Sequence, residues 1–223
     1  MDKRNIFYIL LTIILSILAF VLTLKLVFRT EKINEGKFRV ADVIVTSTAE
    51  LTDKTAENDV WSLNLSQRNI LSMLIENGNK TKIRKIYISD LKVKSKNPIT
   101  FYMLDNEEKL TLTNVPQKLD VEYEIEENGQ IKLEIVALNE NVLRNWEVPE
   151  GTNEIICDGR IFNMAGLSLK DIQFDLTFKL NIVEEIGKNN VLKVKLTLPS
   201  EELLINGADI RRLDKTQFKF KVN

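Results

Sequence analysis

Residues 171–182, DIQFDLTFKLNI, alternate strictly between polar and apolar side chains. A period of two residues places alternate side chains on opposite faces of a β-strand. One buried face and one solvated face are typical of a strand in an antiparallel sheet. The apolar face of this segment would consist of Ile172, Phe174, Leu176, Phe178, Leu180 and Ile182.

The same alternation recurs in two later segments, 192–198 and 218–222. Two earlier strands keep the alternation but change phase, after Ile88 and after Val40, and each change predicts a β-bulge. Shorter strands are expected near residues 60–65, 99–104, 109–113 and 154–162.

Residues 119–137 are predicted to form a hairpin. Pairing Ile125 with Ile131 keeps the apolar side chains on one face, which a two-residue turn would not do. The loop is then Glu127-Asn128-Gly129, with Gly129 in the left-handed conformation.

One helix is expected, Gln67–Asn77, with Ser66 as its N-cap and Gly78 as its stop. The fold class that follows is mostly β. It is an antiparallel, β-sandwich-like domain with one short helix, preceded by a single N-terminal transmembrane helix.

The transmembrane helix is predicted from Ile6–Leu24, nineteen residues without charge, Gly or Pro. As a helix this segment is about 29 Å long, which matches the thickness of the bilayer core. Lys25 can reach the headgroups, so the span extends to Phe28. Residues 1–29 are therefore the anchor, 30–36 a spacer and 37–223 the β domain, as one sandwich or as two small units that divide near residue 116.

Two alternatives to this interpretation concern cleavage of the segment and its orientation in the membrane. A cleaved signal peptide also has a basic start and an apolar run, but its apolar run is usually shorter and ends at a small-x-small site. Orientation is set by charge, and the positive residues after the span outnumber those before it. We nevertheless expect a single-pass protein of the cell membrane whose large C-terminal domain is extracellular, since long domains cross largely regardless of charge.

Composition excludes several classes of function. Residues 1–36 carry a net charge of +2 and the remainder −3, so nothing favours nucleic acid as a partner. The chain has no His, which removes the commonest general base and most catalytic zinc sites. Cys157, the only cysteine, follows two isoleucines and is interpreted as a buried thiol rather than a reactive one. No cofactor and no metal are expected.

Two polar patterns could indicate a specific chemistry, a serine nucleophile and a calcium site. Ser89 and Lys92 match Ser-x-x-Lys, in which a lysine can activate a serine nucleophile, but the other motifs of such enzymes are missing. Acidic residues at 120, 122, 124, 126 and 134 alternate along the predicted hairpin. Carboxylates two residues apart on a strand do not converge on one calcium ion, so we expect a solvated face.

Trp146 is the one candidate binding residue, since it precedes Pro149 in a polar segment and is expected to be exposed. Trp61 alternates with Leu63 and Leu65 and is expected in the core. The function predicted is a membrane-anchored, non-enzymatic accessory, scaffold or binding component of a bacterial cell-envelope assembly. It would contact the bilayer through residues 6–28. It would also bind a membrane or envelope protein as its partner. The alternatives are a glycan-binding or cell-wall-binding module that uses Trp146, and a hydrolase that uses Ser89 and Lys92.

Overall fold

The computed structural model describes residues 37–57, 60–78, 80–105, 108–111, 117–119, 129–149 and 158–222. The predicted anchor and spacer, the acidic residues 120–126, the loop residues Glu127 and Asn128, and Cys157 lie outside this part of the chain. Among the described residues, no helix is both long and apolar enough to cross a membrane. Residues 37–223 form one compact unit.

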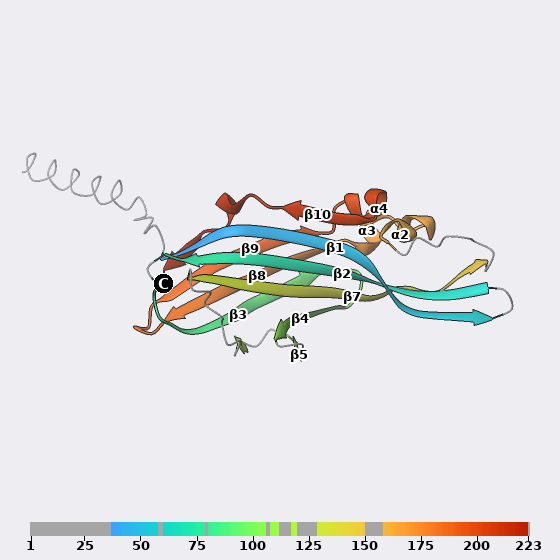
Figure 1. The fold of residues 1–223 in the computed structure, drawn as a ribbon. Helices are drawn as coiled ribbons and strands as arrows, with labels where there is room; N and C mark the ends of the chain where they lie inside the picture. Colours follow the sequence, from blue (N-terminus) through green and yellow to red (C-terminus); the bar gives the residue numbers. More distant parts are fainter. Residues whose placement is uncertain are drawn as a thin grey trace, which may run out of the picture. The chain divides into compact units, whose positions relative to one another are not determined.

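Two antiparallel sheets make up this unit, as the alternating segments predict (Figure 1). The six-stranded sheet runs in the order β10 (Ala208–Arg212), β1 (Phe38–Glu57), β2 (Val60–Asn77), β7 (Gln130–Pro149), β4 (Ile99–Asp105), β5 (Glu108–Thr111). The five-stranded sheet runs in the order β11 (Phe220–Val222), β9 (Asn189–Leu198), β8 (Phe174–Glu184), β3 (Ile83–Lys94), β6 (Gln117–Leu119).

The main core lies between the two sheets. The apolar face predicted for 171–182 is buried from Phe174 to Ile182, and the face of β9 from Leu192 to Leu198 is buried with it. The six-stranded sheet supplies the other half of this core from β1, β2, β4 and β7. Phe38 and Phe220 close it at the end where β1 begins, with ring centroids 6.1 Å apart.

Both predicted bulges are confirmed. The register between β1 and β2 shifts between Val40 and Asp42, and the register between β3 and β8 shifts between Ser89 and Lys92. Gly129 has φ +79°, so its left-handed conformation is confirmed too. Each bulge re-phases the strand, so apolar side chains on both sides of it face the same core.

The predicted helix Gln67–Asn77 is wrong, because these residues belong to β2. Leu71, Met73 and Ile75 are buried at alternate positions, and β2 is paired along its length with β1 on one side and β7 on the other. The apolar stripe that favoured a helix also included Ile70 and Leu74, which lie half-buried on the opposite face of the strand. A central strand that is apolar on both faces resembles a helical stripe in sequence.

The helical segments lie elsewhere. Within the described residues they are α2 (Arg160–Met164), α3 (Leu169–Ile172), α4 (Glu202–Asn206) and the 3₁₀ turn η1 (Lys215–Gln217), rather than one helix. The strand predicted near 154–162 is therefore wrong in its described part, and the strand predicted from 171 begins at Phe174. Asp171 instead accepts hydrogen bonds from the backbone and hydroxyl of Ser168, which cap α3.

The predicted hairpin 119–137 is wrong where it can be compared. Leu119 pairs with Ile86 in the five-stranded sheet, whereas Ala137 lies between Asn69 and Phe101 in the six-stranded sheet. The alternation of each strand was correctly identified, but alternation does not say which strand is the partner.

A second, smaller core lies between the helices and one end of the six-stranded sheet. Here β1, β2 and β7 continue past the main core as a three-stranded arm, residues 49–57, 60–65 and 143–149, and the helices pack against it (Figure 1). Helices α2 and α4 approach closely because Gly159 carries no side chain. A Cβ on Gly159 would fall 2.3 Å from both the carbonyl oxygen and a methyl carbon of Leu203.

Candidate functional site

Several backbone irregularities occur together where the arm leaves the sandwich. The register between β1 and β2 shifts between Leu51 and Asp53, and the register between β2 and β7 shifts on both sides of Leu65. Asn141 and Asn145 on β7 have φ +52° and +49°, in the left-handed region that few residues other than Gly and Asn adopt. Bulges and strained residues concentrate next to binding sites, where they re-aim side chains.

A pocket of about 360 Å³ lies on the sheet at this level. Four neighbouring strands line it: β1, β2, β7 and β4. The lining residues are Glu50, Thr52, Ser66, Arg68, Tyr102, Leu138, Glu140 and Asn141. Arg68 lies between Gln67 and Asn69, whose side chains are buried, so alternation places it on the face directed away from the other sheet. We call this hollow the outer-face pocket.

Arg68 is the central charge of the outer-face pocket. Its side chain is half-buried, and its Nε is fully buried and has no hydrogen-bond partner. Within the described chain no ion pair reaches its guanidinium, although Glu50 and Glu140 line the same pocket. A buried donor without an acceptor is destabilising, so an unpaired guanidinium in a pocket indicates a site for an external acceptor.

The floor of the pocket is held rigid. The Ser66 hydroxyl accepts a hydrogen bond from the backbone N–H of Asn141 at 3.0 Å, which fixes the bulge of β7 against β2. On the reverse face Gln67 donates to Asn69 at 2.9 Å, and Asn139 donates to Gln67 at 3.3 Å. Buried amides joined in this way fix the backbone on which Arg68 and Glu140 are mounted.

The chemistry available in the outer-face pocket is recognition by charge and hydrogen bonding. It offers one guanidinium, two exposed carboxylates, the ring of Tyr102 and the side chain of Leu138. In the part of the chain that the structure describes, no group of three His, Cys, Asp or Glu side chains is placed to hold a metal ion.

A second pocket of about 270 Å³ lies where β3 ends beside the start of β8. Three of its polar side chains have partners, and a fourth, Lys94, is exposed. Lys96 pairs with Asp171 at 2.9 Å, Gln173 donates to the carbonyl of Pro199, and Asp175 accepts from Thr197. The outer-face pocket is therefore the better candidate site, because its central charge is half-buried and forms no ion pair with the described residues.

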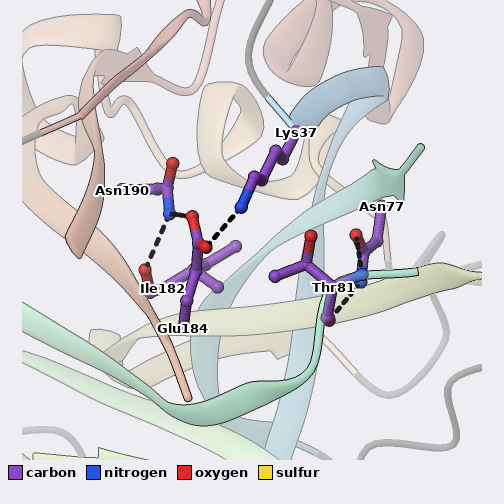
Figure 2. A network of polar contacts seen from close by, with 6 residues as sticks. All are labelled: Lys37, Asn77, Thr81, Ile182, Glu184 and Asn190. Atoms are coloured by element: carbon purple, nitrogen blue, oxygen red, sulfur yellow. Dashed lines mark hydrogen bonds and ion pairs between the residues drawn. The ribbon is translucent and has the colours of Figure 1, made fainter. Parts of the chain in front are cut away.

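An ion pair with one buried partner lies at the opposite end of the domain, where β1 begins. Lys37 donates to one carboxylate oxygen of Glu184 at 2.7 Å, and Asn190 donates to the other at 3.0 Å (dashed lines in Figure 2). Glu184 is 1% exposed. Burial raises the pKa of Glu184, but the hydrogen bonds from Lys37 and Asn190 and the charges of Lys37 and Lys188 outweigh burial, so its pKa lies below the usual value of 4.5.

The predicted binding residue Trp146 lies on the arm, away from the outer-face pocket. It is opposite Leu63 on β2, while Trp61 is opposite Val148, so the two tryptophans are diagonal neighbours on one face. Both are half-buried against the second core. The expectation of a core position for Trp61 is met only in part, and Trp146 is less open than its polar neighbours suggested.

Ser89 and Lys92 lie on either side of the bulge in β3. The Ser89 hydroxyl accepts a hydrogen bond from Asn181 at 2.9 Å, and Lys92 is exposed. A lysine acts as a base when burial destabilises its charged form, and an exposed lysine lacks that environment.

Sequence reasoning did not identify the residues of the outer-face pocket. The available signal was the polar run Ser66-Gln67-Arg68-Asn69 inside an otherwise apolar strand. A second polar run, Asn139-Glu140-Asn141, is the matching signal on β7. The first run was assigned to the start of a helix, where polar residues are ordinary.

Comparison with known proteins identifies no relative: no protein-family model, no curated protein and no solved structure matches the chain. The functional interpretation therefore depends on the geometry of the outer-face pocket and on the chemistry of the sequence.

Proposed function

We propose that the protein is a membrane-anchored, non-enzymatic binding or scaffold component of a bacterial cell-envelope assembly. Residues 6–28 anchor it in the bilayer, and the β domain of residues 37–223 is extracellular and binds the partner. The observation that carries the binding role is the half-buried Arg68 in the outer-face pocket, which forms no ion pair within the described part of the chain. A charge left without a partner on a rigid sheet favours recognition of a second molecule.

Two observations favour binding over catalysis. The sequence offers no His as a general base. The alternative Ser-x-x-Lys arrangement places Lys92 in solvent, and the Ser89 hydroxyl accepts a hydrogen bond from the amide of Asn181, which is not a base. These features support a module whose polar groups hold a ligand in place.

A glycan-binding or cell-wall-binding module is the second candidate. The diagonal pair Trp61 and Trp146 supports it, since two aromatic rings on one face of a sheet can stack on sugar rings. Packing of both rings against the second core reduces the area that a sugar could cover. This candidate uses the arm, whereas the first uses the outer-face pocket.

Affinity purification from detergent-solubilised membranes tests the proposal. We expect the wild-type chain to retain a stoichiometric envelope protein, and Arg68→Ala to retain at least roughly tenfold less, equivalent to a loss of about 1.4 kcal/mol in binding. Arg84→Ala is the matched control, because it removes an exposed arginine from β3 in the other sheet. A wild-type chain that elutes alone would contradict the proposal. Co-elution of wall polysaccharide, lost in Trp146→Ala, would favour the second candidate.

A further inference from the structure

We propose that the outer-face pocket binds a small zwitterionic ligand of the class of amino acids and short peptides. The ligand's carboxylate would lie against Arg68, and its ammonium group near Glu50 or Glu140. This inference rests on the proposed function, since it names the kind of molecule that the binding domain recognises.

The carboxylate side of the proposal follows from Arg68. A guanidinium presents a planar fork of N–H donors that matches the two oxygens of a carboxylate. The side chain of Arg68 is half-buried and forms no ion pair with the described residues, and its strand places it between the strands that carry Glu50 and Glu140. A ligand carboxylate would supply the acceptor that the described chain does not.

The position proposed for the ligand's ammonium group follows from the charged residues that line the pocket. Glu50 on β1 and Glu140 on β7 are exposed and lie on the two sides of β2. Glu50 is opposite Ser66, two residues from Arg68 on the same face, so the carboxylate and the guanidinium are diagonal neighbours. A simple anion would meet two carboxylates in this pocket, and a simple cation would meet Arg68. A zwitterion complements both signs of charge.

The size and walls of the pocket limit the ligand further. Its volume of about 360 Å³ is at the small end of the range for sites that hold small molecules. Tyr102 is 4% exposed and Leu138 is half-buried, so they provide an apolar wall that suits a short aliphatic side chain. These dimensions favour a ligand between a single amino acid and a short peptide.

Titration of the purified full-length chain in detergent, followed by isothermal calorimetry, tests the ligand class. The probes are alanine, dialanine and trialanine, each free, N-acetylated and C-amidated. We expect at least one free zwitterion to bind, and either blocked form to bind at least roughly tenfold more weakly. Tightest binding of alanine would indicate a free amino acid, and tightest binding of trialanine would indicate a peptide.

Two variants connect the titration to the pocket. Arg68→Ala should lose binding of the free zwitterion, whereas Arg84→Ala should bind as the wild type does. Absence of binding by every free probe up to about 10 mM, or equal binding of free and blocked forms, would overturn the zwitterion proposal. Unchanged binding by Arg68→Ala would overturn the assignment to this pocket. If the titration fails but Arg68→Ala still loses the partner in membrane purification, the ligand class is wrong and the binding function stands.

Discussion

Phe178→Ala is expected to lower the free energy of unfolding by about 4 kcal/mol, the largest effect of any substitution proposed for this domain. Phe178 is 1% exposed in the centre of β8, and its ring belongs to the main core between the sheets. Removing the ring loses the free energy of burying its apolar surface. It also leaves a cavity that the close-packed neighbours on the two paired strands cannot fill. Chemical denaturation of the purified chain, followed by tryptophan fluorescence, measures the change.

The matched control is Lys195→Ala on β9, the strand next to β8. Lys195 is exposed on the outer face of the same sheet, so its loss should change stability by less than about 0.5 kcal/mol. Equal effects of the two substitutions would contradict the assignment of Phe178 to a core between two sheets.

Lys37→Met is expected to destabilise the domain by about 3 kcal/mol, because it leaves the carboxylate of Glu184 buried without its cation. The control is Arg39→Met, two residues further along the chain, which breaks the ion pair between Arg39 and Glu76. Arg39 and Glu76 are 73% and 33% exposed, so water screens this pair and its loss should cost less than about 1 kcal/mol. Comparable losses in the two variants would contradict a special role for the buried pair.

The same ion pair makes stability depend on pH. The folded state holds the pKa of Glu184 below the ordinary value of 4.5, so Glu184 binds a proton less readily when folded than when unfolded. Its contribution is therefore complete above 4.5 and is lost as the pH falls through the lower, folded pKa. Denaturation at a series of pH values should show a steeper acid loss for the wild type than for Glu184→Gln. Parallel curves would contradict this assignment.

The sequence was sufficient to predict which side chains enter the core of several strands. The alternation of β8 and β9 predicted their buried faces, and phase changes after Val40 and Ile88 predicted two bulges. These features are local, because side-chain direction in a strand depends only on the parity of the position.

The partner of each strand, and the choice between helix and strand for residues 67–77, could not be predicted in the same way. Leu119 and Ala137 belong to different sheets although both alternate well, because alternation does not specify the neighbouring strand. Residues 67–77 were taken for a helix, since a strand between two others can be apolar on both faces. The local sequence does not show that β1 and β7 pair with the two edges of this strand.

The candidate site was the least predictable feature. The outer-face pocket combines residues from β1, β2, β4 and β7, which the sheet order brings together and the sequence keeps apart. Trp146 could be named from its polar neighbours, but its packing against the second core depends on Leu63, more than eighty positions earlier in the chain. Arg68 differs from other arginines only in the folded chain, where its side chain is half-buried and its buried Nε has no hydrogen-bond partner among the described residues.

Membrane fractionation tests the central claim, that an apolar segment at residues 6–28 permanently tethers a β-sandwich binding domain to the bilayer. The membranes are washed at alkaline pH, and the N-terminal residue of the recovered chain is determined by mass spectrometry. We expect an intact chain in the membrane pellet that still contains Ile6–Phe28. A chain that begins after Phe28, or one that remains in the soluble fraction, would contradict it.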